Sequence, residues 1–351
     1  MSEQTNDTKA ADQEAGAQAA ETRGLSQGQI VRKRFMHNTA AVVSVFVFLG
    51  VVLLAFTSIG FGPVPGWWQW DFREQPPVQS GGAPTMGLFP PTIGDHPFGQ
   101  DNLGRDLFAM TMRGTQMSLI VMFFVGIITG VIGVVVGATA GYFRGWVEGV
   151  LMRLTDVIII IPLLVLAAVL GRMAMTFVDP GVGQVIVLGI LIGLFAWTAL
   201  ARLVRAEILS LREREFVDAA RLAGASDRRI VFKHILPNSV GVITVNLTLL
   251  LAAAVLTETA LSYLGFGVQA PDWSLGKLIS DNQQAFVTRP WLFWWPGIFI
   301  ILICLSINFV GDGLRDAFDP RQKKFKAKKA TESEEHMLDE TDRVGGQGKP
   351  A

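Results

Sequence analysis

Five long stretches of the chain contain no Asp, Glu, Lys or Arg, and this feature constrains the fold more than any other. A membrane-spanning helix needs about 20 mainly apolar residues, whereas buried helices of soluble domains are usually about half that length. Each stretch can supply one span, so together they predict an integral membrane protein. The charge-free stretches are residues 35–70, 114–143, 180–201, 234–257 and 290–311.

A sixth span is predicted at about residues 150–175, although only residues 157–171 of it are free of charge. Asp156 precedes this part and Arg172 follows it, and long side chains near a helix end can reach the lipid headgroups. Pro162 would kink the helix, which neighbouring helices can tolerate.

The distribution of basic residues supports six spans. Residues 205–233 contain seven Lys and Arg residues, and residues 315–329 contain another seven. Loops rich in Lys and Arg remain cytoplasmic. Six spans place both segments, together with Arg32 to Arg34, on the cytoplasmic side, whereas five spans would place one outside. We therefore expect an all-α, multi-pass protein of the plasma (inner) membrane with six transmembrane helices and both termini in the cytoplasm.

Composition excludes several other classes of function. Lys plus Arg and Asp plus Glu number 30 each, so the basic excess typical of nucleic-acid binders is missing. The single cysteine, Cys304, allows neither an internal disulfide nor a cysteine zinc site. A histidine metal site is not expected from four scattered histidines, and no Ser–His pair or paired catalytic carboxylates support an intramembrane enzyme. The sequence also lacks the G-x-x-x-x-G-K-[ST] phosphate loop, so we expect no metal, no cofactor and no ATP hydrolysis by that route in this chain.

The chain is expected to divide into five regions. The two ends are predicted to be disordered cytoplasmic tails, because they are polar and poor in aromatic residues. The first span follows about 30 polar residues without the usual cleavage site, which favours a retained helix over a signal peptide. The predicted regions are the tail 1–30, the segment 31–60 with the first span, the external loop 61–113, the core 114–321 with five spans and a cytoplasmic loop at 205–238, and the tail 322–351.

The external loop is rich in Gly, Pro and Trp, and its Trp67, Trp68 and Trp70 suit a membrane interface. It is interpreted either as an interfacial loop or as a contact for an external partner.

The second span carries glycines three or four residues apart. This spacing places small residues on one helix face and allows another helix to approach closely. The pattern predicts tight helix packing and leaves open whether the partner helix belongs to this chain. The glycines are Gly126, Gly130, Gly133, Gly137 and Gly141.

The cytoplasmic loop predicts two short helices between Leu211 and Asn238. Apolar residues at helical spacing (Phe216, Ala219, Ala220 and Ala223) form the first helix, and Gly224 ends it. A second helix is expected from about Ser226 toward Pro237. The pair is either an ordinary solvated loop or a compact protrusion, here called the knob, that docks on a cytosolic protein. Gly224 is expected to need either an unusual backbone conformation or a close approach that a Cβ would obstruct.

At this loop the sequence resembles the permease subunits of binding-protein-dependent ABC importers. Their signature is Glu-Ala-Ala, three residues, Gly, about ten residues and an Ile-x-Leu-Pro ending. The corresponding residues are Asp218-Ala219-Ala220, Gly224 and Ile235-Leu236-Pro237. Asp replaces Glu, and Ile235 lies one place closer to the proline.

Three further stretches are similar to the dipeptide, oligopeptide and nickel permeases, and to their second, C-type subunit. They are His96–Asp106, which contains the motif residues Asp101, Gly104, Arg105 and Asp106, and the stretches Glu258–Gly265 and Gly311–Arg321. Gln100 stands where Thr is usual. The resemblance covers about residues 30–321 and leaves out the insert 62–95.

The resemblance implies a type I ABC importer permease fold and a non-catalytic translocation subunit in the membrane lipid. Its implied partners are a homologous permease in a heterodimer, two cytosolic ATPases that bind ATP and Mg²⁺, and an external solute-binding protein. Peptides are the expected substrate, and the alternatives are nickel or another small solute and, from a different class, a self-sufficient secondary carrier. The resemblance assigns ATPase coupling to Glu215, Asp218, Ala219, Ala220, Gly224, Ala225, Ile235, Leu236 and Pro237.

Polar residues within spans are costly and often functional. Five of them could line a pathway or, alternatively, form hydrogen bonds between helices. Glu258 could receive the amino terminus of a peptide or serve as an internal salt bridge or cap. The candidates are Asp156, Asn246, Thr257, Glu258 and Asn308.

Overall fold

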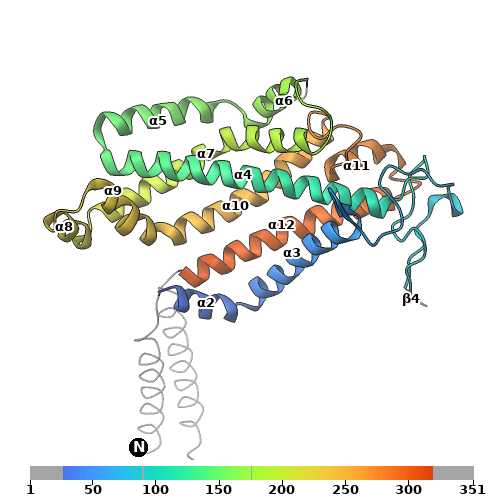
Figure 1. The fold of residues 1–351 in the computed structure, drawn as a ribbon, viewed down its shortest axis with the longest axis horizontal. Helices are drawn as coiled ribbons and strands as arrows, with labels where there is room; N and C mark the ends of the chain where they lie inside the picture. The colour runs from blue at the N-terminus through green and yellow to red at the C-terminus, as the bar shows by residue number, and fades with distance from the viewer. Residues whose placement is uncertain (1–26, 89–90, 175, 319–351) are drawn as a thin grey trace, which may run out of the picture. The chain divides into compact units, whose positions relative to one another are not determined.

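The computed structural model describes residues 27–88, 91–174 and 176–318, most of which are helical (Figure 1). These residues divide into two units. One unit comprises Thr39–Asp312, and the other comprises the residues up to Asn38 and from Gly313 onward.

The smaller unit contains helix α2 (Gln27–His37) and the end of α12 (Trp291–Phe318). The Asn38 side-chain amide donates a hydrogen bond to Asp316 at 3.3 Å, and Arg34 donates to the carbonyl of Ala317 at 3.4 Å. Helix α2 includes residues 27–30, which the sequence predicts as part of a disordered tail. The remainder of both predicted tails lies outside the described residues.

Within the described part of the chain, five helical segments are long and apolar enough to cross a membrane, and they coincide with the five charge-free stretches. A sixth candidate is the pair α5 (Gly145–Ile160) and α6 (Leu163–Ala174), which bends by 82° at Ile161 and Pro162. Proline has no backbone N–H and disrupts the helical ladder, so the predicted kink is confirmed. The five segments are α3 (Thr39–Ser58), α4 (Leu107–Phe143), α7 (Val182–Arg212), α10 (Leu236–Tyr263) with the turns before it, and α12.

The bent pair connects two helices, α4 and α7, that pack in parallel. Residue numbers increase in the same direction along both helices at their contacts, so the first residues of α4 and α7 lie at the same end. The segment between them must therefore return toward that end, which supports the predicted sixth crossing as a broken span. The contacting pairs are Val121 with Gly189, Val125 with Gly193, Gly133 with Leu200, Gly137 with Val204 and Gly141 with Ile208.

The glycines of α4 are divided between two neighbours. Gly126 and Gly130 lie against leucines of α10, whereas the later three lie against α7. A Cβ on Gly137 would lie 2.5 Å from the carbonyl oxygen of Ala201, so only glycine permits this approach. The helices that pack against the glycines of α4 thus belong to the same chain, a question that the sequence alone left open.

Helix α4 is the centre of the larger unit, since it contributes buried side chains to four hydrophobic clusters. The first cluster joins it to α3, α10 and α12, and the second to α6, α7 and α10. The third joins its last turns to α7 and to the segment after it, and the fourth joins its first turn to Phe72, Trp273 and Leu278.

Residues 59–106, here called the cap segment, precede α4. Their described residues form two short hairpins and one 3-10 turn. Helix α4 begins at Leu107, earlier than the predicted loop boundary at 113, because residues 107–119 are all buried beneath the cap segment and the residues around α11. The elements are β1 (Gly60–Phe61) with β2 (Val64–Pro65), η1 (Ser80–Gly82), β3 (Gly87–Leu88) with β4 (Pro91–Thr92), α11 (Leu275–Asn282) and η3 (Gln283–Ala285).

The chain between α7 and α10 forms α8 (Glu215–Leu222), α9 (Asp227–Arg229) and the π-helical turn η2 (Ile230–Ile235). The second predicted helix runs through η2 to Pro237 and continues into α10. Pro237 lies in the first turn of α10, where a missing N–H costs little. Figure 1 shows α8 and α9 at one end of the larger unit, the α8 end, and α11 at the other, the α11 end.

Candidate functional site

Helix α8 is held in the knob by one buried side chain. Val217 has no exposed surface and packs in a cluster with Ile230 and Ile235 of η2 and Ile208 of α7. The predicted apolar face comprises Phe216, Ala219, Ala220 and Ala223, but only Ala220 is partly buried and the other three are exposed. Val217 lies three residues before Ala220, which is partly buried in the same cluster, so this spacing was the signal that was overlooked.

Gly224 ends α8 through its backbone conformation. Its φ of +75° lies in the left-handed region, and the amides of Gly224 and Ala225 donate to the carbonyls of Arg221 (2.9 Å) and Ala220 (3.0 Å). This pair of bonds is the Schellman arrangement, which commonly ends helices at glycine. A Cβ on Gly224 would meet no atom within 4 Å, so the close approach considered from the sequence does not occur within the described chain.

The knob exposes both apolar and charged side chains. Leu222 is 90% exposed and Phe232 is 65% exposed. Asp218 pairs with Arg221 at 3.1 Å on the exposed side. Of the residues predicted to couple to an ATPase, Ile235 is buried, Ala220, Ala225 and Leu236 are partly buried, and the others are exposed, namely Glu215, Asp218, Ala219, Gly224 and Pro237.

The last turn of α4 contacts the knob, a connection that the sequence analysis did not identify. The Tyr142 hydroxyl donates to Asp227 at 2.6 Å, and Arg212 donates to the Tyr142 carbonyl. Arg144 pairs with Glu213 at 2.7 Å. These residues are distant in sequence and follow no shared spacing, so no sequence pattern could have paired them.

The motif residues 101–106 build the entry into α4. The Asp101 carboxylate accepts from the Leu103 amide at 2.9 Å and from the Arg105 amide at 2.8 Å, and it pairs with the Arg105 guanidinium at 2.6 Å. Gly104 has φ +84°, and a Cβ there would lie 2.0 Å from the Pro76 carbonyl oxygen. This part of the family motif is therefore a tight turn that presents Asp106 to the helix.

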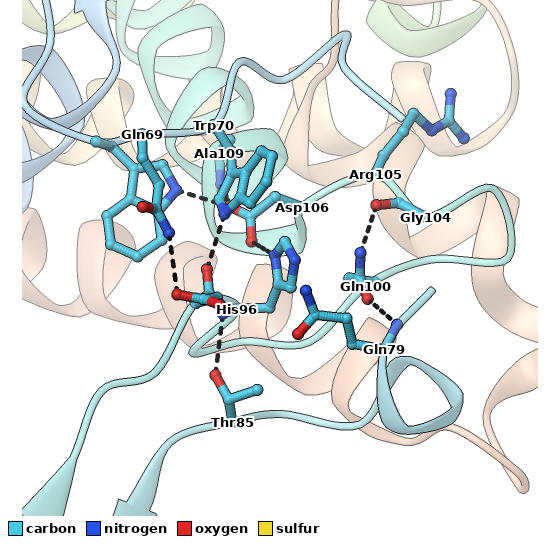
Figure 2. Close-up of polar contacts among 12 residues, drawn as sticks. Gln69, Trp70, Gln79, Thr85, His96, Gln100, Gly104, Arg105, Asp106 and Ala109 are labelled. Atoms are coloured by element: carbon cyan, nitrogen blue, oxygen red, sulfur yellow. Dashed lines mark hydrogen bonds and ion pairs between the residues drawn. The ribbon is translucent and has the colours of Figure 1, made fainter. Parts of the chain in front are cut away.

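Asp106 caps α4 and is the centre of a buried cluster (Figure 2). Its carboxylate accepts from the Ala109 amide at 2.8 Å and from the Trp68 indole at 3.0 Å, and it lies 2.8 Å from His96 Nδ1. Burial raises the pKa of the Asp106 carboxyl, whereas these hydrogen bonds oppose the rise. His96 stacks on Trp70, so two of the three tryptophans predicted at the interface contact this cluster.

Gln100, which replaces the usual Thr, joins the motif to the cap segment (Figure 2). Its side-chain amide donates to the carbonyls of Gly104 (2.8 Å) and Pro77 (3.3 Å), and its carbonyl accepts from the Gln79 amide at 2.7 Å. A threonine side chain is too short to make all three bonds. The replacement of the usual Thr by Gln100 therefore allows contacts with Pro77 and Gln79 of the segment 62–95.

Glu258 lies in a fully buried hydrogen-bond network near the α11 end. Ser118 of α4 and Ser262 of α10 each donate to its carboxylate at 2.7 Å, and Ser274 before α11 is a polar neighbour of it. The residue has no exposed surface. This environment favours the interhelical hydrogen bond over contact with a pathway in this conformation.

A second buried polar network lies nearby and was not predicted. Arg113 of α4 pairs with Asp272 at 2.7 Å and donates to the Gln116 side chain at 3.0 Å. Gln116 donates in turn to the carbonyls of Ala55 (2.8 Å) and Gly60 (2.7 Å). The network joins α3, α4 and the segment before α11.

The other candidate pathway residues lie apart from one another. Asn246 and Thr257 bond to carbonyls of their own helix, at 2.8 Å and 2.9 Å, and Asn308 is partly exposed on α12. Asp156 pairs with Arg202 at 2.6 Å in an open cleft of about 420 Å³ between α5 and α7. Asp156 is thus the candidate that lines an open space, and the cleft is lined by Gly145, Glu148, Gly149, Met152, Asp156, Arg202 and Arg205.

Within residues 27–88, 91–174 and 176–318, no group of three or more His, Cys, Asp or Glu side chains could hold a metal ion.

Comparison with known proteins gives the class. Residues 133–324 match the family described as binding-protein-dependent transport system inner membrane component. Residues 26–78 match the N-terminal transmembrane domain of oligopeptide transport permease C. This second match enters the segment 62–95 that the sequence analysis had left outside the resemblance, so that boundary was wrong.

Curated relatives match nearly their whole length. The oligopeptide transport system permease protein OppC of Escherichia coli is 39% identical over 303 residues, which are 86% of this chain and 94% of that protein. OppC of Mycobacterium tuberculosis is 37% identical over 299 residues, covering 85% and 96%. A solved inward-facing structure of the MetNI methionine ABC transporter shares 21% identity, covers 60% of this chain and 96% of its own, and has a TM-score of 0.47.

The chain therefore belongs to the family of binding-protein-dependent transport system inner membrane components. It is a multi-pass permease subunit of an ABC importer and not an enzyme, which confirms the expected class and disfavours the self-sufficient carrier. Such a subunit works with a second permease, with ATPases and with a binding protein.

Proposed function

We propose that this chain is the C-type permease subunit of an oligopeptide importer. The observation that carries the proposal is the identity of 37–39% over 94–96% of the length of proteins named oligopeptide permeases. A putative peptide permease of Brucella ovis, 36% identical over 304 residues, agrees in substrate class. These names favour oligopeptides over nickel or another small solute.

The knob is the docking site for the cytosolic ATPases, which bind the ATP and Mg²⁺. Its support is an exposed surface that combines Leu222 and Phe232 with the charged side chains Glu215 and Asp218. Protein interfaces usually combine apolar and charged side chains. Ile235 and Gly224 support this surface. Ile235 is buried in the knob, and the backbone conformation of Gly224 fixes the turn after α8.

Coupling acts through the helices on either side of the knob. Val217 packs against Ile208 of α7 and against η2, which continues into α10. A movement of α8 is therefore passed to two membrane helices. ATP can change the orientation of the pathway only if the ATPases contact the knob differently in the two states.

The α8 end faces the cytoplasm and the α11 end faces outside, where the binding protein delivers its substrate. The positive-inside rule supports this orientation, because the segment 205–233, with its seven Lys and Arg residues, forms the α8 end. A reporter fused after Arg321 is expected to be active only in its cytoplasmic form. Activity of an external reporter at that position would contradict the orientation.

The pathway lies between this subunit and a homologous permease, and Asp156 in the cleft of α5 and α7 is its best supported lining residue. Charged side chains of membrane helices usually face a bundle interior or a water-filled space. Asn246, Thr257 and Asn308 are partly exposed and remain candidates for lining the pathway outside this cleft, whereas Glu258 would have to become exposed in another conformation.

The substrate assignment is tested by uptake in cells that lack this gene. We expect loss of uptake of labelled trialanine and its recovery with the intact gene, while uptake of labelled nickel ion stays unchanged. A control strain carries the Gly224→Asp variant at the same amount in the membrane as the wild type. It shows whether uptake needs a functional subunit or only the presence of the protein. Loss of nickel uptake with normal trialanine uptake would contradict the proposal.

A further inference from the structure

Tyr142 occupies a special place at the end of α4. It is the second-last residue of this 37-residue helix, and its side chain is only 4% exposed. The hydroxyl donates to the carboxylate of Asp227, the first residue of α9, at 2.6 Å. A hydrogen bond to a charged group is stronger than one between neutral groups, so this contact holds the start of α9 to α4.

The other half of the knob lies close to the same side chain. The positive charge of Arg221, in the last turn of α8, acts on the Tyr142 hydroxyl. Arg221 and Asp227 lie on either side of Gly224, so the end of α4 lies at the turn between both helices of the knob. Arg212, at the end of α7, donates to the carbonyl of Tyr142, and its guanidinium lies 5.5 Å from the ring centre.

Helix α4 is well suited to transmit a displacement from this point. It is about 55 Å long at the usual helical rise. Its glycines allow α7 to pack directly against its backbone, and its first turn is fixed at the α11 end by the Asp106 cap. A shift of the knob at Tyr142 therefore reaches the α11 end through a rigid helix that is not continuous with the knob in sequence.

We propose that Tyr142 is a positioning residue for energy coupling: its hydroxyl latches the turn of α8, Gly224 and α9 to α4, so that movement of the knob drives α4 together with α7 and α10. The inference rests on the proposed function, because it requires that ATPases move the knob. It adds a third helix and a specific contact to the coupling path.

The test compares two substitutions that remove the same atom. Tyr142→Phe removes the latch hydroxyl, whereas Tyr263→Phe removes the only other tyrosine hydroxyl of the chain, which donates to Gln283 at 2.9 Å near the α11 end. Complexes are purified through a tag on this chain and placed in lipid vesicles with excess binding protein. ATP hydrolysis and uptake of labelled trialanine are then measured on the same vesicles.

We expect Tyr142→Phe to retain ATPase co-purification and hydrolysis while trialanine uptake per ATP falls about tenfold, a size typical of coupling between sites. Tyr263→Phe should match the wild type. Asp227→Ala should reproduce the loss, and the double variant Tyr142→Phe with Asp227→Ala should be no worse than either single variant, because both remove one contact. Asp227→Asn retains an acceptor and should lose less.

An unchanged uptake per ATP in Tyr142→Phe would overturn the latch, even if the melting temperature fell, because that result describes a purely structural bond. If Tyr142→Phe fails to assemble, Asp227→Ala provides the same ratio from the other partner of the bond. A wild-type complex that holds no ATPase, or does not take up trialanine, would overturn the proposed function and this inference with it.

Discussion

The guanidinium of Arg113 lies 2.7 Å from the carboxylate of Asp272, and both side chains are almost fully buried. The two residues are 159 positions apart, one in the second turn of α4 and the other before α11. Their pairing connects two parts of the α11 end that no local sequence signal relates.

Asp272→Leu should strongly destabilise the protein, because it leaves the Arg113 charge buried without a partner. Breaking a buried pair in this way typically costs about 3–5 kcal/mol. The expected result is a large fall in the melting temperature of the detergent-purified protein. The double variant Arg113→Met with Asp272→Leu removes both charges and should recover much of the loss. Equal melting of the single and double variants would show that the pair is not what holds this region.

Substitutions of Gly224 separate its backbone role from its place in a docking surface. Asp and Asn both tolerate the left-handed conformation, and neither Cβ meets an obstacle here. We expect Gly224→Asn to retain most uptake, whereas Gly224→Asp adds a negative charge to the docking surface and should abolish uptake and ATPase co-purification. Western blots of the membrane fraction establish matched levels. Full activity of Gly224→Asp would show that the knob is not the coupling element.

Asp106 should make stability depend on pH. Burial raises its pKa above the usual value of 3.8, so the folded state favours the protonated form. Its stabilising contribution is fully present below the unfolded pKa and is lost as the pH rises through the higher folded value. The melting temperature of the wild type should therefore fall relative to Asp106→Asn as the pH rises across that range. A difference between the two proteins that stays constant with pH would refute this prediction.

Glu258→Gln should weaken the packing of α4, α10 and α11. The carboxylate accepts from Ser118 and Ser262 through its two oxygens, whereas the amide nitrogen of glutamine cannot accept a hydrogen bond. A buried donor left without an acceptor costs about 1–3 kcal/mol, so we expect a lower melting temperature and reduced uptake with assembly retained. Ser262→Ala, which removes one donor, is a milder control. Unchanged melting together with impaired uptake would assign the carboxylate to the pathway instead.

The sequence predicts the membrane helices well because the bilayer imposes a simple requirement of length and polarity. The charge-free stretches, the kink at Pro162 and the glycine spacing of α4 all follow from that requirement and from local backbone geometry. The start of α4 could not be predicted in the same way. Arg113 looks like a boundary in sequence, yet it lies within the helix because Asp272, far along the chain, compensates its charge.

The conformation of a candidate site residue is predictable where its hydrogen bonds lie within one turn of the chain. Gly224 and the turn at Asp101 are of this kind. The contacts of Tyr142, Glu258 and Gln100 depend on segments brought together only by packing, and no spacing within one segment indicates them. Polarity within a span marked Glu258 correctly as unusual, but only its three serine neighbours indicate the structural role.

The parallel packing of α4 and α7 has a consequence for how the chain is assembled during synthesis. Gly133, Gly137 and Gly141 find their neighbours only after the residues up to Ile208 have been made, and the broken span must first return through the bilayer. Until then α4 stands in the lipid with an unfilled groove along its second half. A nascent chain that ends before Val182 would thus offer the insertion machinery an unpacked helix face to bind. Packing of α7 then covers that face.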